Sequence, residues 1–110
     1  MEFNEYQNLA QRTSNTSRQI DKVINGVMGL NGEAGECIDI VKKHYFQEHT
    51  LDEYKLKDEL SDVLWYVAET ATGLGITLEE IAEYNILKLK KRFPDGFDAD
   101  KSINRSEYNE

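Results

Sequence analysis

The sequence contains one cysteine and one proline in 110 residues. A single cysteine, Cys37, excludes an internal disulfide framework and is typical of a reducing compartment. The single proline, Pro94, disfavours a loop-rich domain and favours helices. No apolar run approaches the length of a membrane span, and the first residues lack the basic start and apolar stretch of a signal peptide. We therefore expect a cytoplasmic protein that does not bind membranes.

Positive charge is also scarce, because 13 Lys and Arg residues stand against 21 Asp and Glu residues, for a net charge of −8. Non-specific binding to nucleic acid or to an anionic membrane requires a basic face, so neither is an expected partner. Small anionic ligands stay open where cations bridge them to the protein. With 39% hydrophobic residues, the chain has a lean core for one domain over residues 1–110, and oligomerisation would complete the burial.

The hydrophobic pattern predicts an all-α fold with four main helices. The expected helices cover roughly residues 3–12, 20–46, 50–72 and 77–93. Capping boxes at Thr50 and Thr77 open the last two helices. Residues from about 94 onward are expected to be mostly irregular. Two of the helices are too long for a single pair to cover, which predicts an antiparallel helical bundle completed by oligomerisation.

Two acidic pairs at i, i+3 spacing are candidates for a site: Glu33 with Glu36, and Glu59 with Asp62. In so acidic a chain, such pairs also arise by chance on solvated faces. A helix turns by about 100° per residue, however, and on this count each acidic pair lies on the same side of the apolar face of its own helix. Antiparallel packing therefore brings all four into one cleft. A turn centred after Gln47 sets Glu36 opposite Glu59 and Glu33 opposite Asp62.

Four carboxylates at one level repel one another unless counterions separate them. Ligands that offer only oxygen atoms favour hard divalent cations over zinc. A ferritin-like di-iron site would need a Glu-x-x-His pair, and neither His44 nor His49 follows a glutamate at that spacing. The sequence therefore predicts a site for Mg²⁺, Mn²⁺ or Ca²⁺, with Glu33, Glu36, Glu59 and Asp62 as ligands.

Residues near these acids leave alternatives open. Asn85, Lys88 and Arg92 form a line on the last helix, and the two cations either contact phosphate groups or complement the helix dipole. Gly29, on the acidic side of its helix, either makes room for a ligand or permits close helix contact. Trp65 either stacks on a base or packs in a dimer, and we favour packing.

The acidic motif resembles that of a known family. Gly32-Glu33-Ala34-Gly35-Glu36, followed after 22 residues by Glu59-Leu60-Ser61-Asp62, resembles the Glu-x-x-Glu … Glu-x-x-Asp signature of MazG-like nucleoside triphosphate pyrophosphohydrolases. The flanking stretches 4–7, 41–44, 63–66, 85–88 and 91–97 are similar to that family as well. The resemblance therefore covers nearly the whole chain.

The resemblance implies an all-α homodimer or homotetramer that hydrolyses a nucleoside triphosphate to the monophosphate and pyrophosphate. It implies Mg²⁺ held by the four acids, and a role in removing unwanted nucleotides follows only by analogy. Asn85 and Lys88 match the ligand-contacting helix, and we include Tyr66 and Arg92 among the substrate-binding residues. Our hypothesis for the catalytic base, which takes a proton from the attacking water, is Glu36.

Two other functions stay open. A phosphoribosyl-ATP pyrophosphohydrolase belongs to the same superfamily, but it would need more cations for the extra ribose phosphate than this sequence offers. A helical oligomerisation or regulatory module would need no catalysis and would bind no metal. The preferred base and sugar cannot be derived from the sequence.

Overall fold

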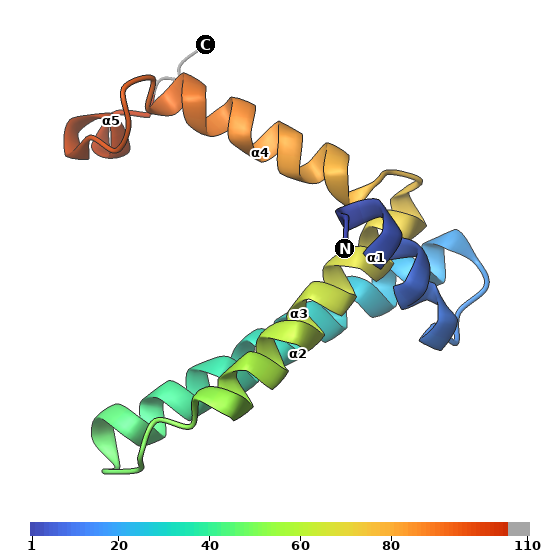
Figure 1. The fold of residues 1–110 in the computed structure, drawn as a ribbon, viewed down its shortest axis with the longest axis horizontal. Coiled ribbons are helices and arrows are strands. Elements are labelled where there is room, and N and C mark those ends of the chain that lie inside the picture. The colour runs from blue at the N-terminus through green and yellow to red at the C-terminus, as the bar shows by residue number, and fades with distance from the viewer. Residues whose placement is uncertain (106–110) are drawn as a thin grey trace. The chain divides into compact units, whose positions relative to one another are not determined.

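The structure, a computed structural model, describes residues 1–105, and these are helical with no sheet strand among them. The helices are α1 (Phe3–Ala10), a short 3₁₀ helix (Gln11–Thr13), α2 (Gln19–Phe46), α3 (Glu53–Leu74), α4 (Leu78–Arg92) and α5 (Ala99–Ile103) (Figure 1). The all-α prediction is confirmed, and α5 lies in the stretch expected to be mostly irregular. In this part of the chain no helix has both the length and the apolar character needed to cross a membrane. The chain divides into two compact units, Met1–Leu78 and Glu79–Glu110, which are described separately.

Helices α2 and α3 lie side by side along their length and form an antiparallel hairpin (Figure 1). Gly26 lies against Thr70, and Gly29 lies against the ring of Tyr66, so closely that a Cβ at either glycine would collide. Gly73 on α3 lies in the same way against the backbone of the first turn of α2. Later residues of α2 therefore contact earlier residues of α3, as antiparallel packing requires. Of the two alternatives for Gly29, the structure has the close helix contact.

The ends of α3 are fixed by local chemistry. Asp52 is its N-cap residue, and the Asp52 side chain accepts a hydrogen bond from the backbone N–H of Lys55 at 3.0 Å. The capping box expected at Thr50 was therefore placed too early, because Asp52 satisfies the first-turn donor instead. At the other end Gly75 has φ 73°, a left-handed conformation that glycine adopts without a Cβ penalty.

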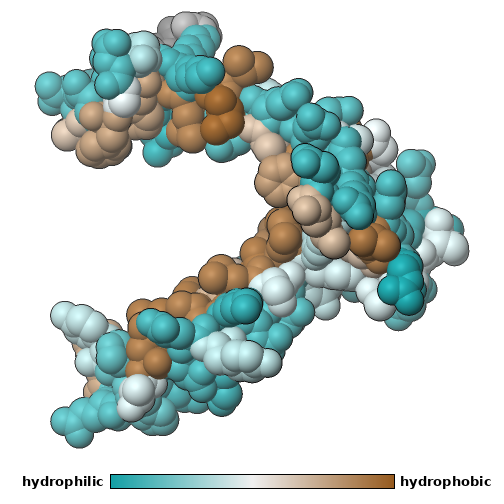
Figure 2. All heavy atoms as spheres, in the orientation of Figure 1, coloured by the Kyte–Doolittle hydropathy of each residue, from teal (hydrophilic) through white to brown (hydrophobic). Residues whose placement is uncertain are grey.

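The apolar core of the first unit is small. Its buried apolar residues are Ala10, Ala68, Ala71 and Leu78. Larger apolar side chains along the hairpin remain exposed, among them Ile20, Ile24, Val27, Met28, Ile38, Leu60 and Leu64. Figure 2 shows apolar side chains gathered along the length of this hairpin. The chain by itself therefore leaves much of its apolar surface in water.

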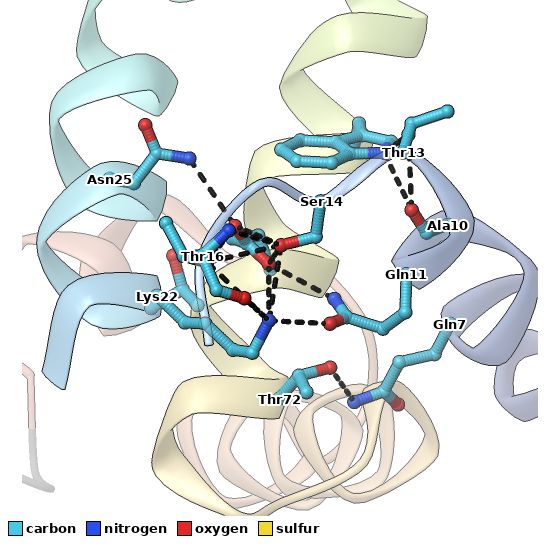
Figure 3. A network of polar contacts seen from close by, with 12 residues as sticks. Gln7, Ala10, Gln11, Thr13, Ser14, Thr16, Lys22, Asn25 and Thr72 are labelled. Carbon is cyan, nitrogen blue, oxygen red and sulfur yellow. Dashed lines mark hydrogen bonds and ion pairs between the residues drawn. The ribbon is translucent and has the colours of Figure 1, made fainter. Parts of the chain in front are cut away.

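A buried carboxylate organises the polar interior of the first unit (Figure 3). Glu69 on α3 is 0% exposed. Its oxygens accept hydrogen bonds from Gln11 Nε2, Ser14 Oγ and Thr16 Oγ1, each at 3.0 Å, and from Asn25 Nδ2 at 3.3 Å. A buried charge is tolerated only when its lone pairs are satisfied in this way.

Lys22 completes this arrangement, which we call the Glu69 network. Its ammonium group lies 3.7 Å from a Glu69 oxygen and donates to the Gln11 side-chain oxygen at 2.9 Å and the Thr16 carbonyl at 2.7 Å. Residues 11–17, the clamped segment, are thereby held against α3. Short hydroxyl and amide side chains fold this way because they bond a nearby acceptor more readily than they continue a helix.

Helix α1 is fixed to the end of α3 by one buried amide. Gln7 donates to Thr72 Oγ1 at 3.1 Å and to the Ile76 carbonyl at 2.9 Å, and its own oxygen accepts from the N–H of Leu78 at 2.8 Å. All the hydrogen-bonding groups of this side chain are engaged. The chain before α2 is therefore held in place mainly by polar contacts.

The pKa of Glu69 is held below its ordinary value. Burial alone would raise this pKa, but the hydrogen bonds from Gln11, Ser14, Thr16 and Asn25 together outweigh it. A carboxylate with a depressed folded-state pKa stabilises the fold above its unfolded pKa, and this contribution is lost as the pH falls through the folded value.

We expect Glu69→Gln to lower the free energy of unfolding by about 3 kcal/mol at pH 7, because an amide nitrogen would then face hydrogen-bond donors. The difference from wild type should shrink as the pH falls below about 4.5, the ordinary glutamate pKa. Urea titrations at fixed protein concentration between pH 3 and 8 would measure it. Glu5→Gln, on the exposed side of α1, is the matched control, and an equal loss in both variants would contradict the assignment.

Candidate metal centre

Three of the four predicted acids converge on one side of the hairpin. Glu33 comes from α2, Glu59 and Asp62 come from α3, and each offers a carboxylate oxygen within 4.8 Å of the others. The contact between Gly29 and Tyr66 lies one helical turn away and fixes the spacing of the two helices at this level. We call these three residues the acidic cluster.

The surroundings of the acidic cluster raise the pKa values of two of its members. The pKa of Glu59 is raised, first by its hydrogen bond with Glu33, then by burial and by neighbouring charges. The pKa of Asp62 is raised by burial, then by the charges of Asp58 and Glu59. The pKa of Tyr6 is raised by burial and by Asp62, which keeps the phenol protonated beside the cluster.

The donor set of the acidic cluster fits a hard divalent cation. All three residues offer carboxylate oxygen, which Mg²⁺ and Mn²⁺ prefer, and none offers the sulfur or imidazole ligands typical of zinc. Neighbouring carboxylates contribute to the raised pKa values of Glu59 and Asp62, so negative charge accumulates at this level of the hairpin. A cation bound here would compensate this charge.

Glu36 lies outside the group of three. It is exposed and lines an open polar pocket of about 470 Å³, which Glu59 and Asp58 also line together with Lys43 and His49. Glu59 therefore belongs both to this pocket and to the acidic cluster. The roles of Glu36 as a fourth ligand and as the catalytic base stay predictions.

A second open pocket, of about 310 Å³, adjoins the acidic cluster. Its lining residues are Thr13, Glu33, Asp62, Trp65 and Tyr66. We call it the aromatic pocket, and its size is at the lower end of the range of about 300–1,000 Å³ for small-molecule sites. The structure thus places Tyr66, predicted to bind substrate, beside two of the predicted metal ligands.

Trp65 fixes one wall of the aromatic pocket. Its indole N–H donates to the carbonyl of Ala10 at 3.1 Å and to the hydroxyl of Thr13 at 3.0 Å. Its ring meets the ring of Tyr66 edge to face, with centroids 5.1 Å apart. Trp65 therefore packs within the first unit and also borders the pocket, and its roles in base stacking and in a dimer stay predictions.

The three residues predicted on the last helix belong to the second unit. Asn85 on α4 is exposed, whereas Lys88 and Arg92 are half-buried. The Arg92 guanidinium lies 5.7 Å from the centroid of the Phe93 ring. Because the acidic cluster lies in the first unit, a contact between these residues and a ligand bound there stays a prediction.

Two residues near the acidic cluster escaped the sequence analysis as site residues. Tyr6 lies within the first expected helix, and Thr13 directly follows its expected end at residue 12. No spacing rule marks Thr13, since its position depends on the distant residues Trp65 and Glu69. The one available signal was the run of hydroxyl residues from Thr13 onward, which is unusual enough to indicate a shared polar partner.

Comparison with known proteins identifies the class. Residues 24–97 match the MazG nucleotide pyrophosphohydrolase domain, and this range includes the acidic cluster and Glu36. The chain belongs to the MazG family.

One curated relative matches part of the chain. The Gene 37 protein of Mycobacterium phage L5 is 39% identical over 69 residues, which are 59% of this chain and 60% of that protein. The chain therefore spans less than two thirds of the length of this relative. No solved structure matches the chain.

We expect Glu59→Gln to raise the melting temperature by a few degrees in EDTA at pH 7, because it removes like-charge repulsion from the acidic cluster. The same variant should lose the rise in melting temperature that Mg²⁺ or Mn²⁺ gives wild type. A raised folded-state pKa stabilises the fold only below the unfolded pKa, and that contribution is lost as the pH rises through the raised value. The two proteins should therefore converge near pH 4 in EDTA.

Thermal melts at fixed protein concentration, with EDTA or with a divalent cation, would measure both effects. Glu5→Gln removes an equal charge from exposed α1 and should keep the cation response of wild type. A Glu59→Gln protein that still gained stability from Mg²⁺ as wild type does would exclude Glu59 as a ligand.

Proposed function

We propose that the protein is a Mg²⁺-dependent nucleoside triphosphate pyrophosphohydrolase, which converts an NTP or dNTP to the monophosphate and pyrophosphate. The observation that carries the proposal is the convergence of Glu33, Glu59 and Asp62 from two helices, within a range that matches the MazG domain. Removal of unwanted nucleotides from the cellular pool would suit this reaction.

Mg²⁺ would be held by Glu33, Glu59 and Asp62, with Glu36 as the fourth ligand. When bound, the cation neutralises the phosphates and polarises the bond to be broken. The charged residues Lys88 and Arg92 of α4, with Asn85, would bind the phosphate chain. Tyr66 would form a wall for the rest of the substrate.

Glu36 would act as the general base. Water would attack phosphorus, a new P–O bond would form, and the anhydride bond between the first and second phosphates would break. The water proton would pass to the Glu36 carboxylate, and the leaving group would be pyrophosphate. The exposure of Glu36, and the pocket it shares with Glu59, suit a carboxylate that must exchange its proton with solvent.

The protein would work as a homodimer or homotetramer in which hairpins complete a helical bundle. Support comes from the exposed apolar side chains of α2 and α3, since Ile24 is 49% exposed and Met28 is 70% exposed. An apolar strip along a soluble helix pair calls for a matching surface, and a second copy of the chain offers one by symmetry.

Wild type should release pyrophosphate from one or more canonical or modified triphosphates only when Mg²⁺ or Mn²⁺ is present. Glu36→Gln should lower kcat by at least about 100-fold, because loss of a general base costs that much, while helicity and assembly stay unchanged. A coupled pyrophosphate assay would measure both. Turnover within a few-fold of wild type would exclude Glu36 as the base.

The same substrate screen separates the other functions. Strong preference for phosphoribosyl-ATP would favour that pyrophosphohydrolase. A helical interaction module would neither bind Mg²⁺ in calorimetry nor release pyrophosphate. Glu5→Gln should match wild type throughout and so controls for a general effect of lost negative charge.

Light scattering at micromolar concentration should give the mass of a dimer or a tetramer. Ile24→Glu should lower this mass, because a charge would enter the apolar strip, whereas Asn31→Glu, at an exposed polar position on the same helix, should not. A monomeric wild type would exclude the proposed assembly.

A further inference from the structure

The aromatic pocket has one wall that is not part of any regular helix pairing. Thr13, at the end of the short 3₁₀ helix, lines this pocket together with Glu33 and Asp62 of the acidic cluster. Because the pocket adjoins the predicted metal ligands, the part of a nucleotide that follows the phosphates would enter it. Thr13 would then face the sugar or the base.

The hydroxyl of Thr13 has a restricted hydrogen-bonding capacity. It donates its one hydrogen to the Ala10 carbonyl, at 3.2 Å, and accepts from the indole N–H of Trp65, at 3.0 Å. A hydroxyl group has one hydrogen and two lone pairs. One lone pair is therefore left, and Thr13 can accept a further hydrogen bond but has no hydrogen left to donate.

The position of Thr13 is held from two sides. On one side, Trp65 donates hydrogen bonds to the carbonyl of Ala10 and the hydroxyl of Thr13. On the other, Ser14 and Thr16, which Figure 3 labels in the same network, donate to Glu69. These side-chain contacts fix the clamped segment against α3. Trp65 also lines the pocket directly, whereas Glu69 acts on the pocket only through this segment.

We propose that Thr13 determines specificity, by accepting a hydrogen bond from a donor group on the nucleoside part of the substrate. The proposal rests on the proposed function, and it makes Trp65 and Glu69 positioning residues. The donor is a sugar hydroxyl or a base amino group, since both present an N–H or O–H to the remaining lone pair.

Thr13→Val removes the acceptor at nearly constant volume, and Thr13→Ser keeps it. Each would be assayed with wild type on triphosphate pairs that differ in one donor. The sugar arm compares a ribonucleotide with its deoxy and dideoxy analogues, and the base arm compares dCTP with the 2-pyrimidinone analogue that lacks only the 4-amino group. We expect Thr13→Val to raise KM about 10-fold for the member that carries the donor, with kcat and the other member unchanged.

Thr13→Ser should restore the wild-type ratio of kcat/KM within each pair. The ratio compares two substrates on one protein, so a loss of stability in Thr13→Val does not affect it. The arm in which the ratio changes identifies the donor as sugar hydroxyl or base amino group. A ratio unchanged in both arms, or a change that Thr13→Ser shares, would overturn the proposal.

Trp65→Phe keeps an aromatic ring and removes the N–H that orients Thr13. It should shift the same ratio in the same direction as Thr13→Val, and the double variant should shift it no further, because both act through one hydroxyl. If Trp65 has only a structural role, Trp65→Phe would lower the melting temperature and leave the kcat/KM ratio within each pair at its wild-type value.

The proposed function and the role of Thr13 can be refuted separately. A wild type that releases pyrophosphate from no triphosphate would refute the proposed function, and the role of Thr13 with it. A wild type that is active and loses no discrimination on Thr13→Val would refute only the role of Thr13.

Discussion

The close approach of α2 and α3 is the constraint on which the rest of the first unit depends. Gly26 and Gly29 let the two helices touch where any side chain would force them apart. That contact sets both the spacing and the register of the hairpin, so that Glu33 on one helix meets Glu59 and Asp62 on the other. The helix contact and the acidic cluster are thus two consequences of one packing arrangement, and a change in the first would move the second.

The first unit treats its carboxylates in two opposite ways. Glu69 is buried, yet four side chains donate to it and its pKa is depressed, so the charge stabilises the fold. Glu59 and Asp62 meet other acids, and their pKa values are raised. The charge of Glu69 is compensated within the protein, whereas a bound cation is our proposal for compensating the charge of the acidic cluster. This contrast distinguishes a structural carboxylate from the carboxylates that we propose as metal ligands.

Much of the hairpin follows from the sequence, because helix periodicity and a short turn determine which residues can meet. Helix periodicity and the position of the turn were sufficient to predict that Glu33 and Asp62 lie on one side of the hairpin. For Gly29, the sequence did not decide between room for a ligand and close helix contact. The surroundings of Glu69 could not be predicted, since they depend on an irregular segment whose partners lie far along the chain. The start of α3 was misplaced for a local reason: Thr50 and Asp52 both offer capping side chains, and only the backbone geometry decides between them.

The polar contacts of the N-terminal segment also bear on the order in which the chain can become structured during synthesis. Gln11 finds its partner 58 residues later and Gln7 finds one 71 residues later. At about 5–20 residues per second on the ribosome, these side chains emerge several seconds before the helix that receives them. The unpaired groups of the N-terminal segment are mostly amides and hydroxyls, which water solvates well. The nascent segment can therefore stay hydrated without aggregating until α3 and the start of α4 have been synthesised.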